Sequence, residues 1–487
     1  MISLIASFAT SALAADIFLH PGDDVLTKTA SLVAGDHYKF YGGVYEITAD
    51  LTWSGQGTAD EPIEISAVDG EQPIFRMSEG WFLVHIQDAA FIEVLGITFE
   101  GADGWEDAGW NAVSIENSSD ITFTDNEIRQ FDGYGINIGG NSTRLNLTRN
   151  WIHDVQSEGI YGGCWDASCF MTDSAIHNNL IHALGFTDLE STNGYGDPVI
   201  EYATGIAIAH GGQGNTVRDN VIFDVTGDGI YTGSTEFGPQ NILEANAIWD
   251  AAGDGIVIEG SALVRNNVIF NVMEDGIQCY DSDRNTLQDV VISFNTVSGA
   301  GEYAIQLEEW VGKTGMVLAN NAIVNPIGYG LQYTFDEGAG EAADPGNVIS
   351  TNVVTGFVSG WDAEVHPKGV VPGGGYEDFE DAAAFNFYPV NTGALVNSAD
   401  PGGETYIPDV DFNGAARQGD VPDVGAYEYG GGPNPGWAIG ESFKETGPIA
   451  ANGGGKLGGC CSKSEDPAAG LILFPVAGLL GWRRRRR

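Results

Sequence analysis

The stretch RDNVIFDVTGDGIYTGSTEFGPQNILEANAIWDAAGDGIVIEGSALVRNNVIFNVMEDGIQCY, residues 218–280, contains two short phrases, each present three times. The first places Asn two positions before an aliphatic residue, as in DNVI, ANAI and NNVI. The second phrase begins with Asp-Gly-Ile and places its next inward-facing residue two positions after the Ile, as in DGIYT, DGIVI and DGIQC. Apolar residues at every second position indicate β-strands, and no helical period is present. The stretch therefore predicts short strands joined by glycine-bearing turns.

The Asn phrase extends in both directions from this stretch and recurs at intervals of 21 to 41 residues. A recurrence of this length is typical of proteins built by stacking one supersecondary unit. The asparagines of the phrase are Asn126, Asn150, Asn179, Asn220, Asn246, Asn267, Asn295, Asn321 and Asn352.

A unit this short cannot bury its own apolar side chains, so successive units must cover one another. We therefore predict an all-β fold, a single-stranded right-handed parallel β-helix (solenoid) of about twelve coils spaced about 4.8 Å apart. We expect the repeated Asn side chains to form a ladder inside the turns, with each amide bonding to the next coil. Residues 44–115 look like earlier coils that lack the Asn phrase.

The composition agrees with this fold and limits the partners. Of 487 residues, 69 are Gly, a content that suits many tight turns and argues against helical bundles. The net charge of −48 repels phosphate backbones and anionic lipids, so we expect no binding to nucleic acid. An anionic polysaccharide could bind only through a bridging cation or a local basic patch.

The two ends predict export and attachment to a bacterial cell surface. An apolar run from residue 2 ends in a small-x-small pattern at Ala14, as in a signal peptide. Near the other end, Cys460 and Cys461 precede a short apolar segment and the arginines of residues 483–487. This order resembles the C-terminal sorting tags of myxobacterial-type surface proteins. The resemblance implies processing near the cysteines, with contact to the membrane only through the tail before processing.

These observations divide the chain into five segments. We expect a signal peptide in 1–14, the β-helix in 15–356, its closing region in 357–429, a flexible Gly/Pro-rich linker in 430–459 and the sorting tag in 460–487.

Two further segments resemble known families. GDHYKFYGGVYEI and the phrase GQGTADEPIEISAVDGEQPIF, within residues 35–75, are similar to the opening coils of chondroitinase-B-like and alginate lyases of the pectate-lyase-like superfamily. Residues 385–429, which end in DVGAYEY, resemble the closing region of bacterial β-helix surface proteins with varied anchors. Both resemblances imply architecture more than chemistry.

Strand alternation predicts which residues face outward beside the inward Ile positions. The outward column reads Asn137, Tyr161, Ala207, Tyr231, Val257, Gln278, Gln306 and Gln332. Aromatic rings, amides and carboxylates on a flat face suit a linear polysaccharide, although ordinary solvated sheet decoration is the alternative. The predicted substrate-binding residues are Tyr161, Tyr231, Glu259, Gln278, Tyr280, Gln306, Glu308 and Trp310.

A second column consists of carboxylates that precede the turn glycines, namely Asp228, Asp254 and Asp275, with Glu158 before them. Stacked carboxylates repel one another, which raises their pKa values or requires a cation, so Ca²⁺ is the candidate cofactor. Asp228 and Asp254 could also serve as an acid–base pair. The alternative is that Asp only stabilises a turn before Gly.

His210 is the third candidate catalytic residue. In the lyase families named above, the base is a Lys and the acid is an Arg in an R-H-G phrase. The corresponding phrase here is Ala209-His210-Gly211, in which Ala replaces Arg. The longest interruption of the repeat, residues 185–205, lies nearby, and long loops on rigid scaffolds often carry function.

The cysteines outside the tail have two predicted roles. Cys164 and Cys169 could form a disulfide that closes a small loop beside the interruption at residues 185–205, where we expect any substrate cleft, or they could be free thiols. Cys279 is predicted to pack inward.

Two hypotheses of different classes remain. In the first, the protein is a surface-attached lyase, hydrolase or epimerase acting on an extracellular polysaccharide. In the second, it is a non-catalytic adhesin or matrix protein that binds glycans or calcium.

Overall fold

The computed structural model describes residues 15–445, except for 78, 102–110, 186, 193–197, 201, 235–237, 311, 334–345, 361–363 and 403–405. The predicted cleavage site at Ala14, the predicted processing at Cys460 and Cys461, and the segments 1–14 and 460–487 lie outside the described residues. Within the described part, no helix has the length and apolar character that a membrane span requires.

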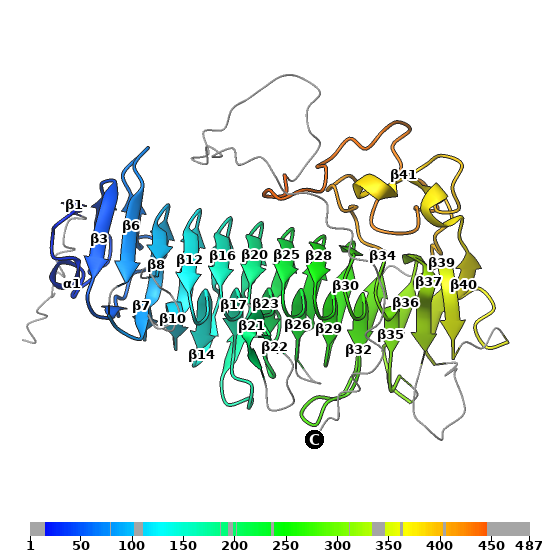
Figure 1. The fold of residues 1–487 in the computed structure, drawn as a ribbon, viewed down its shortest axis with the longest axis horizontal. Coiled ribbons are helices and arrows are strands. Elements are labelled where there is room, and N and C mark those ends of the chain that lie inside the picture. Colours follow the sequence, from blue (N-terminus) through cyan, green and yellow to red (C-terminus); the bar gives the residue numbers. More distant parts are fainter. Residues whose placement is uncertain are drawn as a thin grey trace, which may run out of the picture. The chain divides into compact units, whose positions relative to one another are not determined.

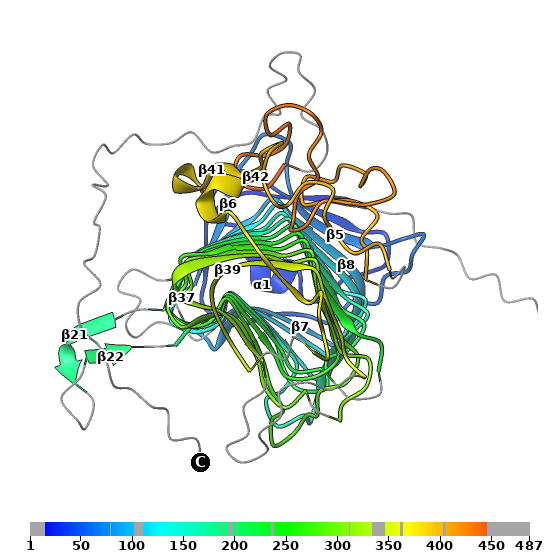
Figure 2. The same ribbon diagram turned by 90° about the vertical axis from the view of Figure 1, so that its right-hand side faces the viewer.

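The chain forms a right-handed parallel β-solenoid with almost no helix, as predicted (Figure 1). Successive turns place strands on three faces, and a view along the axis shows the turns superimposed (Figure 2). Ten turns carry a separate strand on each of the three faces, slightly fewer than the predicted twelve, and in the turns that follow them β37 (Ala322–Tyr333) and β39 (Asn352–Ser359) each span two of the faces. A single helical turn, α1 (Val25–Lys28), lies at the N-terminal end.

Face 1 is a parallel sheet that runs the length of the solenoid. Its strands, in spatial order, are β1 (Asp16–Leu19), β2 (His37–Phe40), β5 (Ile63–Ala67), β8 (Ala90–Leu95), β11 (Ser119–Thr124), β15 (Asn146–Thr148), β19 (Ala175–His177), β24 (Thr216–Arg218), β27 (Asn241–Glu244), β30 (Ala262–Arg265), β33 (Val290–Ser293), β36 (Val317–Ala319) and β38 (Val348–Ser350), with β14 (Asn141–Thr143) and β18 (Phe170–Thr172) beside them.

Face 2 follows face 1 in each turn. Its strands are β3 (Gly43–Ile47), β6 (Pro73–Met77), β9 (Thr98–Glu100), β12 (Glu127–Phe131), β16 (Trp151–Val155), β20 (Leu180–Leu184), β25 (Val221–Val225), β28 (Ala247–Ala251), β31 (Val268–Phe270), β34 (Thr296–Ser298), the first parts of β37 (Ala322–Tyr333) and β39 (Asn352–Ser359), and β40 (Val370–Pro372).

Face 3 carries the Gly-Ile phrase. Its strands are β4 (Leu51–Trp53), β7 (Phe82–Gln87), β10 (Asn111–Glu116), β13 (Ile136–Gly139), β17 (Ile160–Gly162), β23 (Ile206–Ile208), β26 (Ile230–Thr232), β29 (Ile256–Ile258), β32 (Ile277–Cys279), β35 (Tyr303–Leu307) and the last parts of β37 and β39. Because β37 and β39 span the corner, faces 2 and 3 form one continuous sheet.

The predicted asparagine ladder is confirmed along the corner between faces 1 and 2. Each Asn Nδ2 donates to the Oδ1 of the next Asn at 2.8–3.1 Å, from Asn126 to Asn352. The same Oδ1 also accepts the backbone N–H of the preceding coil's Asn, as Asn267 does for Asn246 at 3.0 Å. The residue before every ladder Asn has a positive φ of 52–58°, so the chain turns sharply there. The side chain therefore satisfies backbone groups that the turn leaves unpaired.

A shorter ladder that the repeat did not reveal lies at the corner where face 1 begins. Asn215 Nδ2 donates to Asn241 Oδ1 at 3.1 Å, and Ser174 N–H donates to Asn215 at 3.1 Å. Inside the solenoid, the inward residues form one continuous apolar core, in which Cys279 is fully buried as predicted.

The closing region covers the outward side of face 2. It contains two 3₁₀ turns, η2 (Gly375–Asp378) and η3 (Ala382–Ala384), and an antiparallel pair, β41 (Phe379–Asp381) and β42 (Asn386–Pro389). Beneath it, the rings of His182, Phe223, Trp249 and Phe270 stack at centroid distances of 4.7, 4.7 and 5.5 Å. These apolar rings are outward on a sheet, so a cover must exclude water from them.

Two segment boundaries differ from the prediction. The solenoid continues beyond residue 356, because β40 pairs with β39. Residues 430–445, expected to be a flexible linker, pack on the solenoid instead: Trp437 is buried, and the Lys444 ammonium group bonds to Asp219 at 2.8 Å and to the Ala245 carbonyl at 2.7 Å. Composition suggested flexibility, but one buried indole and one buried ion pair hold this segment.

We predict that Asn246→Ala lowers the free energy of unfolding by about 3 kcal/mol, because it removes two donated bonds and leaves the N–H and the side chain of Asn220 without their acceptor. Chemical denaturation measures the change. The control Asn137→Ala, an outward Asn on β13, should cost about 0.5 kcal/mol or less. Equal losses in the two variants would contradict a supporting role for the ladder.

Candidate functional site

The outward column of face 3 lies in the predicted register. Backbone pairing aligns Asn137, Tyr161, Ala207, Tyr231, Val257, Gln278, Gln306 and Gln332 in consecutive strands. The same column continues toward the N-terminus through Ser114 and His85. Period-2 alternation and the inward Ile positions were sufficient to predict this alignment.

Outward position does not mean exposure in the middle of this column. Ala207, Tyr231, Val257 and Tyr280 form a small buried apolar cluster on the outside of the solenoid, with Tyr161 at its edge. Side chains from two loops cover part of this cluster. One loop follows β17 and the other follows β32.

The first loop is closed by a disulfide between Cys164 and Cys169. It presents Trp165, whose indole is 53% exposed although its ring centre lies 5.5 Å from the Tyr231 ring and 4.7 Å from the His210 ring. Figure 1 shows this loop after β17 and the loop after β32 on the same side of the solenoid. Trp165 is thus an exposed aromatic platform on a rigid base.

The second loop supplies Arg284. Its guanidinium carbon lies 5.7 Å from the centre of the Trp165 ring, and Nη1 donates a hydrogen bond to the Trp165 carbonyl. No carboxylate lies within 4.0 Å of this guanidinium among the residues that the structure describes. Sequence reasoning missed both residues, and the only signals were a Trp between two cysteines and an Arg in a polar loop.

Beneath Trp165, His210 takes part in a chain of hydrogen bonds. Asn285 Nδ2 lies 2.7 Å from His210 Nδ1, His210 Nε2 lies 3.4 Å from the Tyr231 hydroxyl, and that hydroxyl donates to Glu259 Oε2 at 2.8 Å. An amide donor on Nδ1 leaves the ring proton on Nε2. The chain then runs from the amide, through imidazole and phenol, to the carboxylate.

Electrostatics keep the side chains in this series of hydrogen bonds either neutral or paired. Burial lowers the pKa of His210, so its imidazole is neutral near pH 7. Burial, together with the Glu259 carboxylate, raises the pKa of Tyr231 far above its usual value, so its hydroxyl stays protonated. Such a chain could move a proton, but His210, Tyr231 and Glu259 are only 2%, 6% and 5% exposed beneath the loops.

Three predicted substrate-binding glutamines form a ladder of their own at the C-terminal end of the column. Gln278 Nε2 donates to Gln306 Oε1 at 3.0 Å, and Gln306 Nε2 donates to Gln332 Oε1 at 3.2 Å. Gln278 and Gln306 are half-buried, as is Glu308, whereas Gln332 is buried. The exposed edges of Gln278 and Gln306 remain on the surface of face 3.

Trp310 does not lie on this surface, and its prediction as a substrate-binding residue was wrong. The side chain is fully buried in the core, and its indole Nε1–H donates to Cys279 Sγ at 3.4 Å. After β35 the chain turns inward, so the strand alternation that predicted its direction no longer applies.

The acidic column lies at the edge of face 3, and its side chains are bound to backbone. Asp228 Oδ1 accepts Asp254 N–H at 2.9 Å, Asp254 Oδ1 accepts Asp275 N–H at 2.7 Å, and Asp275 Oδ1 accepts Tyr303 N–H at 2.9 Å. All three carboxylates are buried. This arrangement matches the turn alternative, because each side chain satisfies one donor in the next coil.

Burial has a strong effect on these carboxyl groups. Desolvation, with repulsion from Asp228 and Asp275, raises the pKa of Asp254 to about 9, and desolvation raises the pKa of Asp275 to about 8. The described residues include no group of three or more His, Cys, Asp or Glu placed to hold a metal ion. Calcium binding by this column stays a prediction.

The interruption at residues 185–205 forms an antiparallel pair, β21 (Thr187–Thr192) and β22 (Pro198–Ile200). Figure 2 shows this hairpin projecting from the solenoid between β20 and β23. Tyr202, just after it, bonds to Asp228 Oδ1, so the base of the insertion is tied to the acidic column.

We predict that Asp254 makes the stability of the protein fall as pH rises. The folded-state pKa of about 9 exceeds the ordinary value of 3.8, so the folded protein keeps a proton that the unfolded chain releases. The stabilisation that this retained proton gives the folded state is fully present below pH 4 and is lost as the pH rises toward 9. The variant Asp254→Asn cannot ionise. At pH 8 it should therefore melt several degrees above the unmodified protein, whereas at pH 4 the two melting temperatures should be equal.

Thermal melts at the two pH values measure this difference, and Asp60→Asn, at an exposed turn position, is the matched control. The same difference at both pH values would contradict the assignment of this proton to Asp254.

Residues 111–292 match the family model described as "Right handed beta helix region". The chain is similar to the solved structure of pectate lyase Pel9A, with 14% identity, coverage of 86% of this chain and 97% of that chain, and a TM-score of 0.46. It is also similar to a mannuronic acid specific polysaccharide family 6 lyase from human gut microbiota, with 15% identity, coverage of 73% of this chain and 90% of that chain, and a TM-score of 0.45. A third similar structure is the A-module of the mannuronan C-5 epimerase AlgE4 from Azotobacter vinelandii, with 15% identity, coverage of 72% of this chain and 91% of that chain, and a TM-score of 0.40. No curated protein matches in sequence. The segment that matches the family model begins at β10, and the same stacking continues on both sides of it.

Proposed function

We propose that this protein binds an extended polysaccharide that carries carboxylate groups, along the outward side of face 3. The observation that carries the proposal is the pair formed by the exposed Trp165 indole and the adjacent Arg284 guanidinium, which has no carboxylate partner among the described residues.

The indole supports this proposal through its shape and its rigidity. A flat aromatic surface binds the C–H face of a sugar ring, and it costs little conformational entropy when the side chain is already fixed. The disulfide of the loop and the packing against Tyr231 and His210 fix Trp165 in this way.

The guanidinium supports the carboxylate part of the proposal. Nine of the thirteen Lys and Arg side chains that the structure describes have a carboxylate within 4.0 Å, and Arg284 does not. Arg binds carboxylates through two parallel N–H bonds, so a uronate ring stacked on Trp165 could place its carboxylate on Arg284.

The flatness of face 3 supports the proposal that the ligand is an extended chain. Parallel strands about 4.8 Å apart present a straight surface over many turns. The half-buried Tyr161 lies on one side of the Trp165 loop, and Gln278 and Gln306 lie on the other. A linear chain along the axis would pass all of them.

A second candidate function is chemical modification of the bound polysaccharide. The chain of hydrogen bonds from Asn285 through His210 and Tyr231 to Glu259 favours it, because a neutral imidazole can accept a proton. In the described conformation Trp165 and the loops cover these groups, so this function also requires movement of the Trp165 loop.

We further propose that the protein is exported and held at a bacterial cell surface, as the patterns around Ala14 and around Cys460 and Cys461 indicate. The low pI of 4.1 and the disulfide are compatible with an extracellular setting.

The binding proposal predicts that Trp165→Ala weakens binding to alginate or polygalacturonate about tenfold, because the stacking contribution is lost. Arg284→Gln should remove most of the preference for polyuronate over neutral dextran. Biolayer interferometry at physiological ionic strength measures both effects.

Two exposed residues away from face 3 provide controls, namely Tyr376→Ala for the aromatic change and Arg144→Gln for the charge change. Absence of binding to any polyuronate, or equal binding in all four variants, would contradict the proposal. Absorbance at 235 nm and new reducing ends in the same mixtures would separate modification from binding alone.

The export proposal predicts that the protein purified from cells lacks residues 1–14 and the arginines of residues 483–487. Mass spectrometry of the intact surface protein measures both ends. An intact arginine tail on surface-exposed protein would contradict processing near Cys460 and Cys461.

A further inference from the structure

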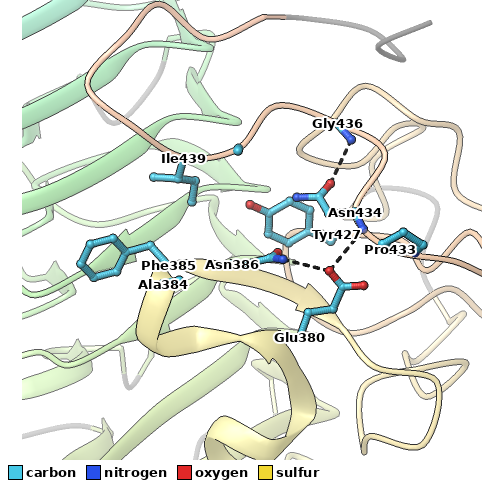
Figure 3. Close-up of a pocket in the computed structure, with 10 residues that line it drawn as sticks. Glu380, Ala384, Phe385, Asn386, Tyr427, Pro433, Asn434, Gly436 and Ile439 are labelled. Carbon is cyan, nitrogen blue, oxygen red and sulfur yellow. Dashed lines mark hydrogen bonds between the residues drawn. The ribbon is translucent and has the colours of Figure 1, made fainter. Parts of the chain in front are cut away.

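A cavity of about 220 Å³ lies in the closing region, among residues of β41, η3, β42 and the segment 427–439 (Figure 3). It is independent of face 3, because its residues belong to the apolar cluster that covers face 2 or lie beside it. Nothing in the proposed glycan-binding surface involves these residues.

One wall of the cavity carries a buried hydroxyl group. Tyr427 is 2% exposed, and its hydroxyl forms no hydrogen bond within the part of the chain that the structure describes. Figure 3 shows this hydroxyl directed toward the side of the cavity where Ile439 lies. A Tyr hydroxyl without a protein partner bonds to whatever occupies the cavity, whether water or a ligand.

A second wall is polar and rigid. Glu380 Oε2 accepts hydrogen bonds from Asn386 Nδ2 at 2.8 Å and from Asn434 N–H at 3.2 Å, and Asn434 Oδ1 accepts Gly436 N–H at 3.0 Å. Figure 3 shows these bonds between the Glu380 carboxylate, the Asn386 and Asn434 amides and the backbone beside them. The wall is therefore held in place without a ligand.

A third wall is aromatic. Phe385 is 43% exposed, and its ring stacks on Phe270 of face 2 at 4.5 Å. The residue adopts a left-handed backbone conformation with φ 59°, which is uncommon for a bulky side chain. Its free surface is available for the apolar face of a ligand.

Charge and volume indicate the class of ligand. Glu380 lines the cavity, and burial together with the nearby Asp411 raises the pKa of Tyr427. These two acidic residues disfavour an anionic ligand. The volume is several times the ~30 Å³ of one water and below the ~300 Å³ of sites for drug-sized ligands. A hydroxyl, a carboxylate, amides and one aromatic surface match a small uncharged molecule with many hydroxyl groups.

We propose that this cavity binds a single uncharged sugar ring, either as a monosaccharide or as the end of a glycan. The sugar hydroxyls supply the partner of Tyr427 and bond to Glu380 and Asn386, and the C–H face of the ring packs on Phe385. The closing region then contributes a second carbohydrate site, specific for a single ring and distinct from the extended surface of face 3.

Saturation-transfer NMR with the full chain tests this proposal. The probes are D-glucose, D-galactose, D-mannose and N-acetyl-D-glucosamine, with D-galacturonate and choline as charged comparisons. We expect saturation of at least one neutral sugar, with a dissociation constant in the millimolar range.

Tyr427→Phe should weaken that binding at least fivefold without lowering the melting temperature, because it removes a hydroxyl that has no described protein partner. Phe385→Leu should weaken it as well. Trp165→Ala should leave it unchanged, which separates this site from face 3.

Saturation of only galacturonate or choline would overturn the proposal. So would the absence of any signal, which would mean a cavity filled with water only, or binding that survives Tyr427→Phe unchanged.

Discussion

The hydrogen bond between the amide groups of successive turns is the interaction on which this structure depends. At each of the sharp corners between faces 1 and 2, a residue with positive φ interrupts the pairing of backbone groups, and the Asn that follows replaces that pairing. An unpaired buried amide would cost about 1–3 kcal/mol at each turn. The ladder connects nine turns and helps to keep their flat outward faces in register, whereas the turns before Asn126 stack without it.

The outward faces differ because different parts of the chain cover them. On face 2, a column of stacked rings is sealed by the closing region, and even the segment 430–445 is held there by the buried Trp437 and Lys444. On face 3, two short loops cover only the centre, around Tyr231. Face 3 therefore keeps an accessible surface, whereas face 2 has become part of a second core.

The acidity of the chain gives local charge a particular meaning. Burial raises the pKa values of Asp254 and Asp275 in the acidic column on face 3, so these two carboxyl groups can keep their protons without a cation. Asp228, Asp254 and Asp275 each bind a backbone N–H group of the next coil. Arg284 is the opposite case, a guanidinium at the surface with no carboxylate partner in the described residues. In a protein with a strongly negative net charge, the position of a cation without a carboxylate partner among the described residues indicates the ligand class better than the net charge does.

The sequence by itself determined the solenoid, the asparagine ladder, the outward register of face 3 and the inward Cys279, because each follows from a short period repeated many times. It did not determine which outward residues are exposed. Tyr231 and Glu259 are covered, and Trp310 enters the core, because loops and strand ends decide burial and have no period. The pairing of Trp165 with Arg284, which are 119 residues apart, and the cavity around Tyr427 arise only when distant segments meet. Local patterns fix the direction of a side chain along a strand, but only the packing of the whole chain fixes what lies above it.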